Sequence, residues 1–172
     1  MTSVAKSVLL VLLMTAMAPL PACQSKSSTD TTAASASAAP IGIAECAACK
    51  MVVREQPAPR GQAVHRDGTR VHLCSIGDLV QYLASPSPHG NATAVFVEAL
   101  EVNFDPKGSD TKERPWVAAE SASYVVGVDR ERIMGPAVLS YRERGEAEAA
   151  AKAHGGKLRT WAELRQFVLE KK

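Results

Sequence analysis

The sequence has little net charge and none of the common catalytic signatures. Its 172 residues include 20 Lys and Arg and 18 Asp and Glu, which gives a formal net charge of +2 at pH 7. A balance so close to zero provides no electrostatic basis for binding nucleic acid, because that interaction requires a basic surface. The chain also lacks a hydrolytic triad signature, a phosphate-binding loop, an HExxH motif and paired catalytic carboxylates. These absences predict that the protein is not an enzyme.

The first 22 residues have the pattern of a secretory signal. Lys6 supplies the positive charge, and the apolar run at 8–18 is too short to span a bilayer as a mature helix. Leu-Pro-Ala-Cys at 20–23 resembles a bacterial lipobox, so we expect Cys23 to become the acylated first residue of the mature chain; the alternative is an ordinary thiol. Two or more acyl chains give stable anchoring. Gln24, in place of Asp, argues against retention in the inner membrane, so we expect an extracytoplasmic lipoprotein on the periplasmic side, held in the outer membrane if the cell is Gram-negative.

Residues 23–42 are predicted to form a disordered tether. Positions 24–40 contain no aromatic and no β-branched apolar residue, so this segment cannot bury enough surface to fold. The remaining part, 43–172, has the usual size of one domain and is long enough to enclose a hydrophobic core.

Two cysteines and a methionine stand close together just after the tether. Cys46 and Cys49 have the spacing Cys-x-x-Cys, and Met51 follows two residues later. In an extended backbone, side chains at i and i+2 point to the same face, so the sulfurs of Cys49 and Met51 can meet at one ion. A thiolate with a thioether favours Cu(I) over Zn(II), which rarely takes methionine. The alternative is that Met51 fills a gap in the core.

The number of cysteines also points to a bound metal. With Cys23 lipidated, Cys46, Cys49 and Cys74 remain, which is an odd number for an exported protein and implies a free or metal-bound thiol. A free thiol is readily oxidised outside the cytoplasm, so a metal is the simplest explanation. One alternative is a disulfide from Cys46 to Cys49 or Cys74. Another is a thioredoxin-like redox centre, although that motif normally follows a strand and opens a helix.

The pattern between residues 43 and 107 predicts a ββαβ unit. Runs typical of strands at 61–66 and 70–74 flank Asp67-Gly68, the strongest short signal for a hairpin. Apolar residues at i, i+3, i+4 and i+7 then predict a helix at 75–84, with Ser75 as its N-cap. A strand is expected at 93–102, where a short continuous apolar run occurs.

A second, similar unit is predicted at 108–172. Its expected elements are strands at 123–128 and 137–141, a helix at 145–154 that ends at Gly155-Gly156, and a short strand at 157–160. Thr160-Trp161-Ala162-Glu163 resembles a capping box that opens a last helix. We therefore predict an α+β fold of two ββαβ units in tandem, rich in antiparallel sheet, with helices packed on one face.

Together with the lipobox and the Ala-rich tether, an ordered set of motifs resembles the NosL family. The motifs are Cys46-Ala-Ala-Cys49-Lys-Met51, Leu73-Cys74-Ser75 before an Asp-Leu-x-x-Tyr-Leu helix, Trp116-Val117, Tyr124-Val125, Met134-Gly135-Pro136 and Gly155-Gly156-Lys157. The resemblance covers the chain from about residue 46 onward. One position departs from it: the family usually has Gly between Cys and Met, where this chain has Lys50.

The resemblance implies a pair of ββαβ units and a copper-binding lipoprotein that serves the maturation of nitrous oxide reductase. For this chain it implies a Cu(I) metallochaperone, with the reductase and its copper-maturation machinery as partners. Cys49 would be the thiolate ligand and Met51 the thioether. We expect Met134 as the third ligand, although it could instead pack in its loop. The alternatives for the third ligand are His65, His72 and Cys74.

Two other classes of function stay open. A thiol-disulfide redox protein would cycle Cys46 and Cys49 between dithiol and disulfide, and Met51 would be dispensable. A lipid-anchored adaptor of a transporter complex would need neither sulfur pair.

Overall fold

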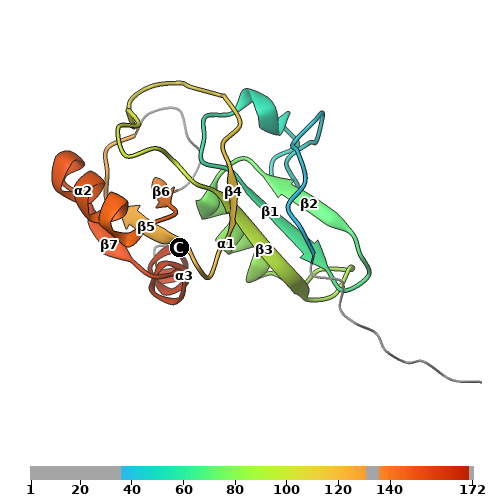
Figure 1. Ribbon diagram of the computed structural model, residues 1–172. Coiled ribbons are helices and arrows are strands. Elements are labelled where there is room, and N and C mark those ends of the chain that lie inside the picture. Colours follow the sequence, from blue (N-terminus) through green and yellow to red (C-terminus); the bar gives the residue numbers. More distant parts are fainter. Residues whose placement is uncertain (1–35, 131–135, 171–172) are drawn as a thin grey trace, which may run out of the picture. The chain divides into compact units, whose positions relative to one another are not determined.

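A four-stranded antiparallel sheet, in the order β2-β1-β3-β4, forms the first half of the fold (Figure 1). The computed structural model describes residues 36–130 and 136–170, so the predicted signal, Cys23 and Met134 lie outside the described residues. The strands are β1 (Gly61–His65), β2 (Arg70–Leu73), β3 (Ala92–Glu98) and β4 (Trp116–Ala118). β1 pairs with both β2 and β3, and β3 pairs with β4, so the sheet includes residues beyond 107.

The hairpin and the first long helix have the local chemistry that the sequence predicts. Gly68 lies in the turn between β1 and β2 with a φ of +85°, which glycine adopts without steric cost. Helix α1 (Ile76–Leu83) begins after Ser75, whose hydroxyl accepts a hydrogen bond from the Asp78 N–H at 3.0 Å. The helix packs tightly on β1, because a Cβ on Gly61 would lie 2.6 Å from the side chain of Leu79.

A three-stranded antiparallel sheet, in the order β6-β5-β7, forms the second half. Its elements are β5 (Ser123–Val126), β6 (Val138–Tyr141), α2 (Arg144–His154), β7 (Lys157–Arg159) and α3 (Trp161–Glu170). Gly155 ends α2 with a φ of +72°, and the Thr160 N–H donates to the Glu163 carboxylate at 2.8 Å, as a capping box requires. The order β6-β5-β7 repeats β2-β1-β3, so the predicted fold of two similar ββαβ units with antiparallel sheets is confirmed.

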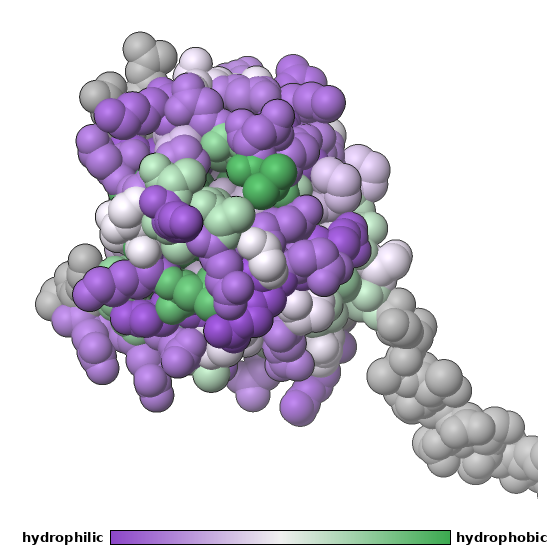
Figure 2. Space-filling model, turned by 60° about the vertical axis from the view of Figure 1, so that its left-hand side comes forward, coloured by the Kyte–Doolittle hydropathy of each residue, from purple (hydrophilic) through white to green (hydrophobic). Residues whose placement is uncertain are grey.

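The two sheets share a hydrophobic core, and the first sheet also contains a buried ion pair. Ile76 of α1 is buried in the same cluster as Tyr124 of β5 and Leu164 of α3. Deeper in the first sheet, Arg60 and Glu98 have fully buried side chains that pair at 2.7 Å. Outside the core, Figure 2 shows a face covered mainly by hydrophilic residues, with hydrophobic residues in small groups. Within the described ranges, no helix combines the length and the apolar character needed to cross a membrane.

Candidate metal centre

A tight hairpin loop carries Cys46 and Cys49. The Cys46 N–H donates to the Met51 carbonyl at 2.8 Å, and the Lys50 N–H donates to the Cys46 carbonyl at 2.9 Å. The residues on either side of the loop pair as an antiparallel bridge. Lys50 closes the turn with a φ of +66°, a left-handed conformation that costs a residue with a Cβ about 1–2 kcal/mol. The glycine that usually occupies this place in the family would avoid that cost.

Cys74 reaches this loop from the end of β2. Cys46 and His72 form a parallel bridge, and the Ala47 N–H donates to the His72 carbonyl at 2.9 Å. These contacts fix the loop against the strand. Cys74 follows the last residue of β2 and precedes Ser75, the N-cap of α1. Cys46 and Cys74 are 28 positions apart in the sequence. The loop, the strand and the start of the helix place them next to each other.

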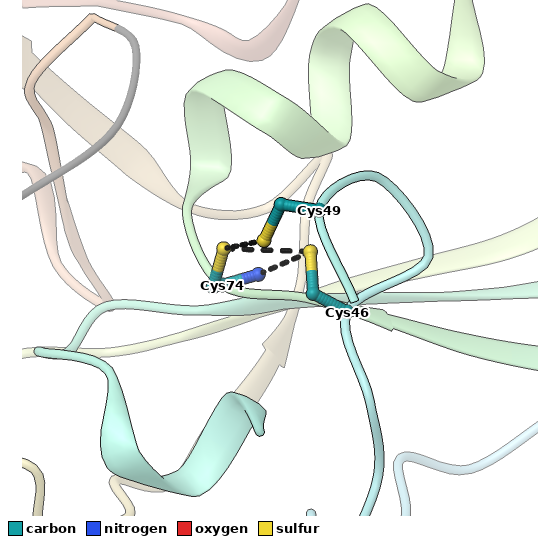
Figure 3. A group of neighbouring side chains, drawn as sticks. All are labelled: Cys46, Cys49 and Cys74. Atoms are coloured by element: carbon teal, nitrogen blue, oxygen red, sulfur yellow. Dashed lines mark hydrogen bonds between the residues drawn. The ribbon is translucent and has the colours of Figure 1, made fainter. Parts of the chain in front are cut away.

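The three cysteine sulfurs lie close together, as Figure 3 shows. The Sγ of Cys74 is 3.4 Å from the Sγ of Cys46 and 3.4 Å from the Sγ of Cys49, and all three sulfurs lie within 4.8 Å of one another. Thiolates that bind one ion at about 2.3 Å lie about 4 Å from one another, so this spacing suits a shared metal. All three residues are free cysteines, and neither disulfide alternative is present in the structure.

Hydrogen bonds favour a thiolate at Cys46. The bond donated by the Cys74 thiol is the main cause of a lowered pKa of Cys46; burial opposes it, and the backbone N–H groups of Cys49, Cys74 and Ala48 reinforce it. The same sulfur–sulfur bond, together with burial, raises the pKa of Cys74, whose Sγ also lies 3.4 Å from Asp78 Oδ2. Burial raises the pKa of Asp78. The hydrogen bond from Cys74 therefore favours loss of the proton from Cys46 before Cys74.

The cysteine cluster is accessible from one side. Cys46 is 0% exposed and Cys74 is 5% exposed, whereas Cys49 is only half-buried. A hollow of about 260 Å³ adjoins the loop and α1, and it is lined by Ala48, Asp78, Gln81, Tyr82 and Ser85. A metal held by the cluster would therefore meet a partner at Cys49, because the other two sulfurs are covered.

The structure brings one predicted ligand into the cluster and adds two cysteines to it. Cys49 is part of the cluster, and Met51 lies in the same loop, half-buried against the core. Met134 lies outside the described residues, so its role and that of Met51 stay predictions. Cys46, whose role the sequence left open, and Cys74, which it offered only as an alternative, complete the cluster. The odd number of cysteines was the signal for both.

The two histidines that the sequence offered as third ligands are not part of this group of donor atoms. Both ring nitrogens of His65 are engaged, with Nδ1 at 2.7 Å from the Gly90 carbonyl and Nε2 at 2.9 Å from the Tyr82 hydroxyl. His72 is buried beside Trp116, and this burial lowers its pKa. Within the described residues its Nε2 has no hydrogen-bond partner.

Converging thiols on a small α+β scaffold are typical of a soft-metal-binding protein. The sequence profile of the NosL family matches residues 41–169, and the chain belongs to this family. The resemblance inferred from the ordered motifs is therefore confirmed.

Known members of the family are similar over most of the folded part. The chain is 29% identical over 130 residues to the copper-binding lipoprotein NosL of Stutzerimonas stutzeri, and 29% identical over 122 residues to that of Achromobacter cycloclastes. The alignments cover 73% and 67% of this chain but 64% and 61% of the relatives, so the chain spans less than two thirds of their length. The crystal structure of the copper chaperone NosL from Shewanella denitrificans matches with a TM-score of 0.61 at 27% identity, over 74% of this chain and 94% of that one.

Proposed function

We propose that this protein is a lipid-anchored Cu(I) metallochaperone outside the cytoplasm, and that it delivers copper to nitrous oxide reductase while that enzyme matures. The observation that carries the proposal is the cluster of three sulfur donors with Cys49 at its accessible edge. The names of the relatives, copper-binding lipoprotein and copper chaperone, support copper as the cargo and delivery as the role.

The chemistry of the donors favours the reduced ion. Sulfur ligands are soft and prefer Cu(I), and all three members of the group are cysteines; the Asp78 carboxylate, 3.4 Å from Cys74 Sγ, does not belong to the group. In the proposed transfer, copper leaves through Cys49 as thiolate and Met51 as thioether, with Met134 as the third ligand predicted from the family resemblance. A ligand from the acceptor binds copper at the accessible edge before the donor sulfurs dissociate from it, so copper is never released into solution.

The proposed lipid anchor determines where the metal site acts. Acylation of Cys23 would hold the folded part near a membrane surface, on the side where an exported copper enzyme is assembled. Delivery needs only binding and exchange of the ion, so the proposal includes no catalytic residue. The reductase and its copper-maturation machinery are the proposed partners.

One observation favours a second function. Cys46, whose pKa is lowered, has its Sγ 3.4 Å from that of Cys74, and a readily ionised thiol beside a second thiol is the arrangement that a redox protein uses. In a thiol-disulfide protein, copper and Met51 would both be dispensable for activity. A Met51→Leu variant therefore distinguishes the two functions: it should keep thiol-disulfide activity if the protein is a redox protein, and lose copper delivery if it is a chaperone.

Deletion of the gene in a strain that makes nitrous oxide reductase tests the proposal. At limiting copper, the reductase should be present but copper-poor and weakly active. The wild-type gene should restore its copper content, and the Cys49→Ser variant should not, because it lacks the accessible thiolate. Ala149→Ser is the matched control, since it adds a hydroxyl at an exposed position of α2, away from the cysteine loop, and keeps every sulfur. Fully loaded, active reductase in the deletion strain would overturn the chaperone role.

A further inference from the structure

Cys46 and Cys74 have no part in a Cys-x-Met ligand set, and yet their sulfurs lie beside that of Cys49. We propose that this chain holds Cu(I) at rest on three thiolates, those of Cys46, Cys49 and Cys74. The inference rests on the proposed function, because it states how the same cargo is bound between loading and delivery. Binding forms three copper–sulfur bonds, and the thiol protons that these bonds replace pass to solvent.

The backbone places the three sulfurs before any ion binds. The Cys46 loop is closed by two of its own hydrogen bonds, and its bridge to His72 fixes it to the strand that leads into Cys74. Cys74 Sγ is the middle atom, at 3.4 Å from each of the other two sulfurs. Because the site is already assembled, the protein loses little conformational entropy when the ion binds.

The surroundings of Cys46 suit a bound thiolate. The Cys74 N–H points at Cys46 Sγ at 3.4 Å, so a backbone donor offsets part of the negative charge at a fully buried sulfur. Leu73, which precedes Cys74, and Ile76, two positions after it, are buried at 0% and 1% exposure. These apolar residues limit the access of solvent from the core side of the site, while the Asp78 carboxylate lies 3.4 Å from Cys74 Sγ.

The different burial of the three cysteines gives them different roles in binding copper and in releasing it. Cys46 and Cys74 are covered and Cys49 is half-buried, so an acceptor can displace only the Cys49 side first. Met51 lies two residues from Cys49 in the same loop and is also half-buried. Its thioether would then serve the transfer step, while the three thiolates hold the resting ion.

The number of sulfurs bound to copper tests this assignment. The reduced full chain is loaded with one equivalent of Cu(I), and X-ray absorption at the copper edge counts the sulfur neighbours. Wild type and Met51→Leu should both show three sulfurs, and Cys74→Ser and Cys46→Ser should each show two. In competition with a Cu(I) chelator, each serine variant should bind roughly 100-fold more weakly or worse, since even an outer-shell partner of a metal ligand is worth about 10–100-fold. Ala149→Ser, at an exposed position of α2, should match the wild type.

A Met51→Leu variant with one sulfur fewer than the wild type would overturn the three-thiolate site. So would a Cys74→Ser variant that keeps the wild-type count and affinity. Either result leaves copper delivery intact, whereas a wild-type chain that binds no Cu(I) refutes the proposed function itself. The Met51→Leu comparison decides the matter even if a buried serine variant fails to fold.

Discussion

Replacement of Lys50 by glycine should stabilise the copper-free protein. Lys50 closes the cysteine loop with a φ of +66°, and this left-handed conformation costs a residue with a Cβ about 1–2 kcal/mol. Glycine removes that cost but gives the unfolded chain more freedom, which lowers stability by about 0.4–1 kcal/mol. The side chain of Lys50 is exposed, so its removal costs little packing. The difference is a gain of about 1 kcal/mol in the free energy of unfolding.

Urea unfolding of the reduced, copper-free chain measures this gain. The midpoint should rise with an unchanged slope, and the melting temperature should rise by about 4 °C for a domain of this size. Lys50→Ala is the matched control, because it removes the same charge but keeps a Cβ and with it the strain. A glycine variant that unfolds at lower urea, or an alanine variant that gains as much, would refute the reasoning. In the complemented deletion strain, Lys50→Gly should restore or improve copper delivery.

Three further predictions concern the fold, the anchor and a surface turn. Glu98→Gln breaks the buried pair with an arginine and should cost about 3–5 kcal/mol in urea unfolding, whereas Glu148→Gln, in an exposed pair, should change stability by less than about 1 kcal/mol. Mass spectrometry of the N-terminal peptide should find an acylated Cys23, and an unmodified N-terminus at another residue would contradict the anchor. Hydrogen bonds from a backbone N–H and from His89 lower the pKa of Asp67 to about 2. The ionised Asp67 should therefore contribute fully to folding stability above the ordinary carboxyl pKa of 3.8, and this contribution should disappear as the pH falls towards 2. An NMR titration should give this low pKa, and His89→Ala should raise it.

The elements of the fold were predictable wherever a local signal fixes them. The turn at Gly68, the cap at Ser75 and the capping box at Thr160 each depend on residues a few positions apart, and each lies where the sequence predicts. Strand β4 was not predicted as a strand, because its three residues are stabilised by pairing with β3, some twenty positions earlier. A segment of that length carries no periodicity of its own.

The site was predictable only in part for the same reason. Cys49 stands in a recognisable local pattern, but the position of Cys74 depends on the bridge between Cys46 and His72, which joins segments distant in sequence. Counting the cysteines indicated a liganded thiol without saying which residues converge. The left-handed turn at Lys50 was likewise indicated only by the glycine that the family has at this position, since a lysine is not a signal for that conformation.

A Cu(I) titration of the reduced chain tests the central claim most directly. The protein is titrated without oxygen against a chromophoric Cu(I) chelator, with and without excess Zn(II), and the same titration is run on Cys49→Ser. The account predicts about one Cu(I) per chain, bound far more tightly than Zn(II), and near-complete loss of this binding in the serine variant. Full Cu(I) affinity in Cys49→Ser, or displacement of Cu(I) by Zn(II) in the wild type, would contradict it.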